Sequence, residues 1–129
     1  MIRESLPSFG DYKMLKKIGA GGMASIFLAK KKGVEGFEKL VVIKRLFENF
    51  AQDEEFLSMF INEAKIASCL NHANIVQIFE LNRTQNSFYI VMEYVMGNDL
   101  RQVLLKSITR KISLYPISLK IVSEIAQGL

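Results

Sequence analysis

The sequence has few of the residues that cross-link a small protein or bind metal ions. Its 129 residues include a single cysteine, Cys69, and a single histidine, His72. One cysteine excludes a framework of intrachain disulfides, and one histidine cannot by itself build a histidine-rich metal site. Because Cys69 lies in an apolar helical stretch, we predict that it is a small residue of the core.

Long apolar runs are also missing. No uncharged run approaches the ~18 residues that a membrane-spanning helix needs. Residues 1–10 contain Arg3 and Glu4 but no apolar core of a secretion signal. We therefore predict a cytoplasmic location for this segment, and no membrane contact from it, while a longer protein could carry an anchor elsewhere.

Half of the residues are hydrophobic, which is a high share for a chain with room for one domain or part of one. A dense core would explain this share, and so would an apolar surface that a missing partner lobe covers. Apolar residues also recur four apart up to the end of the chain, at Ile117, Ile121, Ile125 and Leu129. We therefore favour the covered surface, expect a truncated domain, and note that this face could support self-association.

The net charge is +4, and the basic residues are scattered. The densest tract, Lys30-Lys31-Lys32, could contact nucleic acid or anionic lipid, but such a run is more often the solvated end of a hairpin. No aromatic residues alternate with it, which argues against a nucleic-acid platform. We predict the hairpin end and no nucleic-acid partner.

Residue patterns predict five strands and one long helix. Alternation and turn residues place the strands at 9–18, 25–30, 39–45, 75–81 and 88–93. Acidic residues at Asp53-Glu54-Glu55, followed by apolar residues at helical spacing, predict a helix over 53–70. Asp99 can cap a short helix, and Pro116 suits the first turn of a final one.

The segment Gly19-Ala20-Gly21-Gly22-Met23-Ala24 is glycine-rich. Glycines let backbone N–H groups approach phosphate oxygens, although a simple hairpin turn would use the same residues. A dinucleotide fingerprint would open a helix, whereas a strand-like segment follows here, and the Gly-Lys-Ser/Thr ending of a Walker loop is absent. The loop alone is therefore a weak signal for phosphate binding.

Two charged residues follow the loop. Lys44 directly follows the apolar run Val41-Val42-Ile43. Its ammonium could bind phosphate oxygens, although most lysines in strands are simply exposed to solvent. Glu63 lies within the apolar part of the expected helix and has no basic residue four positions further on. A carboxylate there needs a cation, which favours an ion pair between Glu63 and Lys44 over a free surface glutamate.

The segment 92–97 is an apolar strand that runs out into a short linker. Such a linker exposes backbone N–H and C=O groups, and the edge of a purine needs a donor and an acceptor of this kind. Asp99 could bind ribose hydroxyls or only cap the following helix, and we give capping at least an equal share.

In this order and spacing, the motifs resemble the N-terminal lobe of bacterial, eukaryotic-like Ser/Thr protein kinases. The glycine loop, Val41-Val42-Ile43-Lys44, the helix glutamate, Asn71-His72-Ala73-Asn74-Ile75-Val76 and Val91-Met92-Glu93-Tyr94-Val95 carry the similarity, which extends from about Phe9 to Leu129. The resemblance implies an α+β fold with a five-stranded antiparallel sheet and one major helix. It also implies an N-terminal extension at 1–8, a kinase N-lobe with hinge at 9–95, and a truncated C-lobe at 96–129.

The resemblance also implies an ATP site. Lys44 would bind the α- and β-phosphates and pair with Glu63, the two forming the catalytic pair of this half. Met92 would be the gatekeeper, the backbones of Glu93 and Val95 would bond to adenine, and Asp99 would approach the ribose. The remaining nucleotide-binding positions would be those of the loop and the adenine ceiling: Ile18, Gly19, Ala20, Gly21, Gly22, Ile26 and Val42.

Two positions depart from the family pattern, since Ala24 replaces the third glycine and Val42 stands where alanine is commoner. The family's His-Arg-Asp loop, asparagine metal ligand and Asp-Phe-Gly segment have no counterpart up to Leu129. We therefore expect Mg²⁺ ligands downstream, and expect this chain alone to bind ATP weakly and transfer no phosphate. A nucleotide-binding scaffold of the pseudokinase type and an inactive truncated product remain alternatives, and the protein substrate is not identified.

Overall fold

The computed structural model describes residues 6, 8–113 and 115–129. The described residues form two compact units. The first unit consists of the described residues up to Asn71 together with Gln77–Tyr94. The second unit consists of His72–Val76 together with Val95–Leu129. Residues 1–5 and 7 of the expected N-terminal extension lie outside the described residues.

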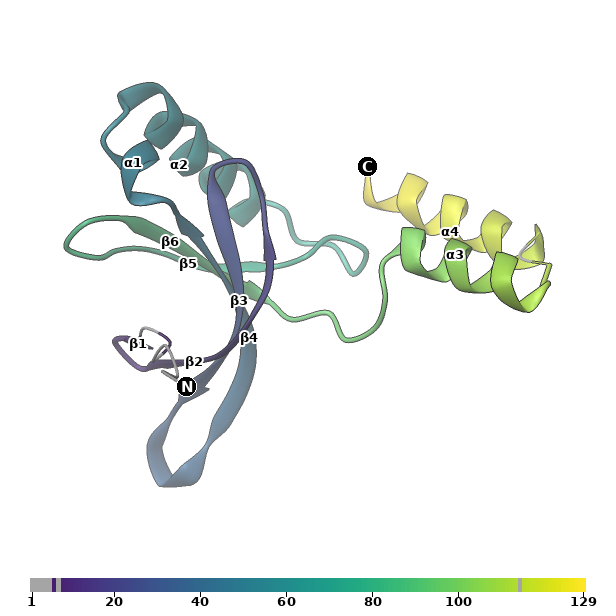
Figure 1. Cartoon of the computed structure of the whole chain (residues 1–129), viewed down its shortest axis with the longest axis horizontal. Coiled ribbons are helices and arrows are strands. Elements are labelled where there is room, and N and C mark those ends of the chain that lie inside the picture. The colour runs from purple at the N-terminus through teal and green to yellow at the C-terminus, as the bar shows by residue number, and fades with distance from the viewer. Residues whose placement is uncertain (1–5, 7, 114) are drawn as a thin grey trace. The chain divides into compact units, whose positions relative to one another are not determined.

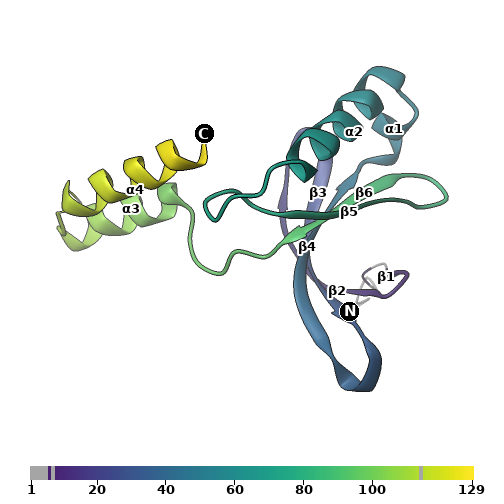
Figure 2. The same cartoon turned by 180° about the vertical axis from the view of Figure 1, so that it is seen from behind.

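The first unit is built on a six-stranded antiparallel sheet with the order β1-β2-β3-β4-β6-β5. Its strands are β1 (Ser8–Phe9), β2 (Tyr12–Ala20), β3 (Ala24–Lys32), β4 (Glu38–Leu46), β5 (Ile78–Arg83) and β6 (Phe88–Glu93). The long helix α2 (Glu54–Ser68) covers one face of the sheet and follows the short helix α1 (Glu48–Ala51), as Figures 1 and 2 show from opposite sides.

The expected α+β architecture with an antiparallel sheet and one major helix is confirmed, although the sheet has six strands where five were expected. The single strand expected over 9–18 is instead divided by a turn at Gly10, whose φ of 53° suits glycine. This turn sets off β1 as a short sixth strand. Pattern reasoning also missed α1 and a 3₁₀ turn at Val34–Gly36, since both are too short to show a period.

The fourth expected strand was placed too early. β5 begins at Ile78, three residues after the expected start at Ile75. The preceding residues instead form a turn in which the Ile75 N–H donates to the His72 carbonyl at 3.1 Å. The Asn74 side chain bonds within the second unit, where it donates to the Glu124 backbone carbonyl and carboxylate, both at 2.8 Å.

The core lies on both faces of the central strands. Helix α2 inserts Phe60 and Ala64 against Ala24, Leu46 and Ile90 on one face. The opposite face carries a second cluster, formed by Tyr12, Met14, Phe27, Ala29, Val41, Ile43, Tyr89 and Val91. Because β4 contributes to both clusters, its residues Val41, Val42 and Ile43 are all buried.

Cys69 corrects the sequence prediction of a core residue. It is exposed at the C-terminal end of α2, where its thiol donates to the Lys65 carbonyl with an Sγ–O distance of 3.4 Å. The apolar stretch around it predicted burial, but the helical period turns this position away from the sheet. The cluster of Phe60 and Ala64 marks the face that is buried instead.

The lysine tract lies at the end of the β3–β4 hairpin, as predicted. Two of its members are not simply solvated, however. Lys30 pairs with Glu38 at 2.7 Å, and Lys31 pairs with Glu80 at 3.0 Å.

Glu80 also joins two distant parts of the sheet. The Tyr12 hydroxyl donates to Glu80 Oε1 at 2.7 Å, although the two residues are 68 positions apart. Burial and this hydrogen bond raise the pKa of Tyr12 from 10.0 to about 12. The Tyr12 hydroxyl and the Lys31 ammonium together lower the pKa of Glu80. Tyr12, Lys31 and Glu80 therefore form a hydrogen-bonded cluster that links β2 and β3 to β5.

We predict that Tyr12→Phe lowers the free energy of unfolding by about 1–2 kcal/mol at pH 7, because it leaves the part-buried Glu80 without one donor. The native protein should also lose stability between about pH 10 and 12, where the unfolded tyrosine ionises and the folded one does not. Urea unfolding at pH 7, 10 and 11.5 tests both points. The variant should lose less stability over this alkaline range, and an equal loss would refute the assignment to Tyr12.

The second unit contains the helices α3 (Leu100–Arg110) and α4 (Tyr115–Gly128). Asp99 caps α3 as predicted, because its carboxylate accepts from the Gln102 N–H at 2.8 Å. Pro116 lies in the first turn of α4, also as predicted. Several apolar side chains of the two helices are exposed, among them Leu105, Ile108, Ile117, Val122 and Ile125. No described helix is both long enough and apolar enough to span a membrane.

Candidate functional site

Lys44 and Glu63 are brought together as the sequence predicted. Lys44 projects from β4, Glu63 projects from the middle of α2, and Lys44 Nζ lies 2.9 Å from Glu63 Oε1. The Lys44 side chain is 22% exposed, whereas that of Glu63 is 54% exposed. An ion pair this exposed contributes at most about 1 kcal/mol to stability. Its main effect is therefore to fix the position of the lysine ammonium.

The strand register explains why Lys44 faces the helix. Residues directly opposite one another in an antiparallel pair share a face, and Lys44 is opposite Ile26 on β3 and Ile90 on β6. Ile90 belongs to the cluster that packs under α2, and the ring of Phe60 lies 5.9 Å from Lys44 Nζ. These apolar neighbours contact the aliphatic part of the Lys44 side chain. Its ammonium remains available for the ion pair with Glu63.

Three of the expected adenine contacts share this face. Val42 lies opposite Met92 on β6 and opposite Leu28 on β3, while Ile26 lies two residues from Leu28, opposite Lys44. Val42 is buried, and Ile26 and Met92 are partly buried. The side chains of Ile26, Val42 and Met92 therefore form an apolar surface beside Lys44, which could accept a flat ligand.

The glycine-rich segment forms the tight turn between β2 and β3. Gly19 lies opposite Ile26, and the Gly21 N–H donates to the Ala24 carbonyl at 2.8 Å. Positive φ angles are found at other glycines, not at Gly19, Gly21 or Gly22. A Cβ atom added at Gly19 or Gly21 would meet no atom closer than 3.9 Å, and at Gly22 none within 4 Å. Neither the fold nor its packing therefore requires glycine at these positions.

The remaining predicted positions are divided between the two units. Ile18 is exposed near the end of β2, next to Gly19 and Ala20. The Glu93 N–H already donates to the Gln77 carbonyl at 2.9 Å, so a purine edge would have to use the Glu93 carbonyl. Val95 and Asp99 belong to the second unit, where Val95 is exposed and Asp99 caps α3.

The described part of the chain offers no cluster of three or more His, Cys, Asp or Glu side chains that could hold a metal ion. The carboxylate next to Lys44 is that of Glu63, and it is already paired. This donor set does not fit a Mg²⁺ ion, which needs several oxygen ligands in octahedral geometry.

Comparisons with known proteins agree with this geometry. The family model described as "Protein kinase domain" matches residues 12–129. A tyrosine-protein kinase, MasK of Myxococcus xanthus (strain DK1622), is 42% identical over 125 residues, which cover 96% of this chain and 19% of MasK. The serine/threonine-protein kinase PrkC of Bacillus subtilis (strain 168) is 43% identical over 93 residues, covering 72% of this chain and 14% of PrkC.

The fold is also similar to a solved kinase domain. The crystal structure of the Mycobacterium tuberculosis PknI kinase domain aligns with a TM-score of 0.70 and 24% identity, covering 95% of this chain and 48% of that one. The chain thus spans less than a fifth of the curated relatives described above and about half of the solved domain. Because the family model covers most of its length, the chain belongs to the protein kinase domain family and represents the N-terminal portion of that domain.

Proposed function

We propose that this chain is the ATP-binding half of a kinase that phosphorylates serine and threonine residues of proteins. The Lys44–Glu63 ion pair at 2.9 Å is the observation that carries the proposal. In phosphoryl transfer a protein works by positioning and by neutralising charge, and this pair fixes an ammonium group where it can meet phosphate oxygens. Since ATP is the donor, we place the reaction in the cytoplasm.

The other residues are assigned around this pair. The turn covers the phosphates and contains Gly19, Ala20, Gly21 and Gly22. Without a Cβ atom, its glycines let phosphate oxygens approach the backbone N–H groups closely, and no group of the protein itself occupies that space. Ile18, Ile26, Val42 and Met92 surround the adenine, the Glu93 carbonyl and Val95 backbone bond to its edge, and Asp99 approaches the ribose. We place the N-lobe and hinge at 9–95 and the beginning of the C-lobe at 96–129.

Mg²⁺ and a catalytic base belong to the proposal as well, but they require residues outside this chain. The relatives are several times longer, so the aspartates that would hold the metal and accept the substrate proton are expected beyond residue 129. Sequencing the native transcript beyond the codon for residue 129 tests this assignment. Aspartates at kinase spacing would support an active kinase, and their replacement would favour a nucleotide-binding scaffold.

Glycine substitutions test the phosphate loop directly. Because neither backbone strain nor packing requires glycine at positions 21 and 22, we predict that Gly21→Ala/Gly22→Ala folds with unchanged thermal stability. Its affinity for ATP should nevertheless fall about tenfold, since two methyl groups then obstruct the approach of the phosphates. Calorimetric titration with ATP and a thermal melt measure the two quantities.

Adenosine provides the matched control for the double glycine variant, because it lacks phosphates. Its affinity should be the same for both proteins. An unchanged affinity for ATP would contradict the assigned loop, and an equal loss for adenosine and ATP would show that the substitutions disturb the adenine contacts instead.

Residue specificity needs a separate measurement, because the names of the relatives include both tyrosine and serine/threonine kinases. Hydrolysis of a substrate labelled by the whole protein should yield phosphoserine or phosphothreonine. Phosphotyrosine alone would overturn the serine/threonine part of the proposal and leave the ATP site untouched.

A further inference from the structure

The first unit has a cavity at the turn between β1 and β2, away from the residues of the proposed nucleotide site. Its volume is about 400 Å³. The lining brings the hydroxyl of Ser8 next to the ammonium groups of Lys13 and Lys32 and the carboxylate of Asp11. All four of these residues are exposed, so an enzyme can reach the serine hydroxyl.

The strand register places the serine and the lysines on one face of the sheet. Ser8 of β1 lies directly opposite Lys13 of β2, and Lys13 lies opposite Lys30 of β3. Residues directly opposite one another share a face, and so do residues two apart on one strand, which adds Lys32. The Cβ atoms of an opposite pair are only about 4.5–5.5 Å apart. A phosphate group on Ser8 could therefore reach the ammonium of Lys13.

The positive charge at this end of the sheet is not balanced. Lys30 pairs with Glu38 at 2.7 Å, but neither Lys13 nor Lys32 forms an ion pair with a described carboxylate. The pKa of Glu38 is lowered mainly by Lys30 and to a smaller extent by the other two lysines, so all three ammonium groups act on the same small region. Asp11 is the carboxylate of the lining, and the two lysines beside it leave the cavity with a net positive charge.

We propose that Ser8 is a phosphorylation site and that Lys13 and Lys32 bind its phosphate. A phosphoserine carries a charge of about −1.5 to −2 at pH 7 and has three strong acceptor oxygens. It can accept charge-assisted hydrogen bonds from both ammonium groups at once, and these are stronger than bonds between neutral groups. The unmodified serine offers neither the charge nor the reach.

The phosphate fastens β1 to the rest of the sheet. This strand has two residues, and the ring of Phe9 stacks on Tyr89 with centroids 5.1 Å apart. The Lys32 N–H donates to the Asp11 carbonyl at 3.0 Å, which joins the β1–β2 turn to β3. A phosphate held by both lysines adds side-chain bonds between the same three strands. Because so short a strand otherwise opens easily, these bonds make local opening rarer.

The activity proposed above can supply the phosphate. The Ser8 Oγ attacks the γ-phosphorus of ATP, the bond from this phosphorus to the oxygen that bridges to the β-phosphate breaks, and ADP leaves with the bonding electrons. The hydroxyl proton passes to the catalytic base, which is expected beyond residue 129. This source of the phosphate rests on the proposed function, whereas its binding by Lys13 and Lys32 does not.

The first experiment places phosphoserine at position 8 of this chain by genetic encoding, which needs no kinase activity. Hydrogen exchange at the Lys32 amide, followed by NMR, should be about tenfold slower than in the unmodified chain, the effect of one charge-assisted hydrogen bond. A ³¹P titration should show a lower pKa for this phosphate than for the same phosphoserine in the urea-unfolded chain, since nearby ammonium groups favour the dianion.

Variants of the lining test which charges hold the phosphate. Lys13→Gln and Lys32→Gln should each remove most of both effects. Asp11→Asn should enlarge them, because it takes away a negative charge beside the phosphate. All three positions are exposed, so these substitutions should leave the fold intact.

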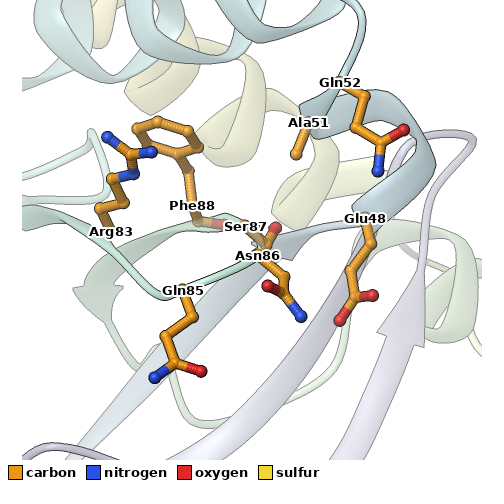
Figure 3. Close-up of a pocket in the computed structure, with 8 residues that line it drawn as sticks. All are labelled: Glu48, Ala51, Gln52, Arg83, Gln85, Asn86, Ser87 and Phe88. Atoms are coloured by element: carbon orange, nitrogen blue, oxygen red, sulfur yellow. Dashed lines mark hydrogen bonds between the residues drawn. The ribbon is translucent and has the colours of Figure 1, made fainter.

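Arg83→Gln is the matched control, since it removes an exposed cation from a different cavity. That cavity of about 410 Å³ lies between α1 and the turn that joins β5 to β6, where polar side chains such as the amide of Gln52 and the guanidinium of Arg83 line it (Figure 3). The variant should leave both effects of the phosphate unchanged. An effect of Arg83→Gln as large as that of Lys13→Gln would show that net charge, and not the cavity at β1, is responsible.

Several outcomes would overturn the inference. Equal exchange at the Lys32 amide with and without the phosphate would do so, as would effects that persist in the double variant Lys13→Gln/Lys32→Gln. If inorganic phosphate slows exchange in the unmodified chain to the same extent, the cavity binds the free ion, and the assignment of Ser8 fails.

A second measurement tests the source of the phosphate in the whole protein. After incubation with ATP and Mg²⁺, mass spectrometry should find phosphate on Ser8, and Lys44→Met should abolish it. Phosphate on other serines or threonines but not on Ser8 would overturn Ser8 as the acceptor. No phosphate on any residue, together with slower exchange in the chain that carries encoded phosphoserine, would refute the proposed function alone.

Discussion

Replacing Lys44 by methionine should reduce the affinity of the chain for ATP by about 10- to 100-fold. The substitution keeps an unbranched apolar stem of similar length and removes the ammonium that lies 2.9 Å from Glu63. A hydrogen bond to a charged group is worth about 1.5–3 kcal/mol, which gives the stated range. Calorimetric titration with ATP measures the effect. In the whole protein, phosphoryl transfer should fall by at least the same factor.

The matched control is Lys39→Met, on the same strand. Lys39 is exposed at the far end of β4, where its ammonium lies 4.3 Å from the Phe79 ring centroid. It should change ATP affinity less than about twofold. Both lysine variants should unfold within about 1 kcal/mol of the native chain. Equal losses of ATP affinity in the two variants would show that general charge, rather than the position of Lys44, governs binding.

Replacing Phe60 by alanine should destabilise the fold by about 3–5 kcal/mol, the largest stability effect that we expect. Phe60 is fully buried at the centre of the cluster that joins α2 to the sheet. Its removal leaves a cavity under the helix that carries Glu63 and loosens the position of that carboxylate. Urea denaturation, with the midpoint and slope compared between the two proteins, measures the loss.

Met59 on the same helix is 52% exposed and provides the control. Met59→Ala should cost less than about 0.5 kcal/mol. Because stability of a small domain is only about 5–15 kcal/mol, Phe60→Ala could leave little folded protein. The milder truncation Phe60→Leu then serves instead, with an expected loss of about 1.5 kcal/mol. Equal effects at positions 59 and 60 would contradict the role of Phe60 in the core.

The sequence was most informative where local pattern and long-range packing agree. The strand over 88–93 was predicted with its observed bounds, because alternation and flanking turn residues coincide there. The acidic run at Asp53 marked the start of α2 because negative charge suits a helix N-terminus, and Asp99 marked the start of α3 as a cap. The start of β5 was misplaced because Ile75 closes a local turn on His72 and Asn74 is held by Glu124, 50 residues away, a contact that no local period records.

The Lys44–Glu63 pair was predicted because a carboxylate in an apolar stretch needs a cation, and the structure contains this pair. The cavity at α1 was not predicted. Its donors come from two segments, around 48–52 and 83–88, and each segment alone reads as an ordinary polar loop. Only the packing of α1 beside the β5–β6 turn brings Gln52 and Arg83 to one cavity. A cluster of uncharged amides carries no spacing signal that sequence reasoning could have used.

The alternation of β4 also limits which changes of chain length the protein can accept during evolution. Val41 and Ile43 face one core, while Val42, Lys44 and Leu46 face the other side of the sheet. Inserting one residue within this strand would exchange the two sets, burying the ammonium of Lys44 and turning apolar side chains away from their partners. The turn at Val34–Gly36 has no buried residue, so it can lengthen freely. Relatives of this chain should therefore differ in length at that turn and keep β4 free of insertions.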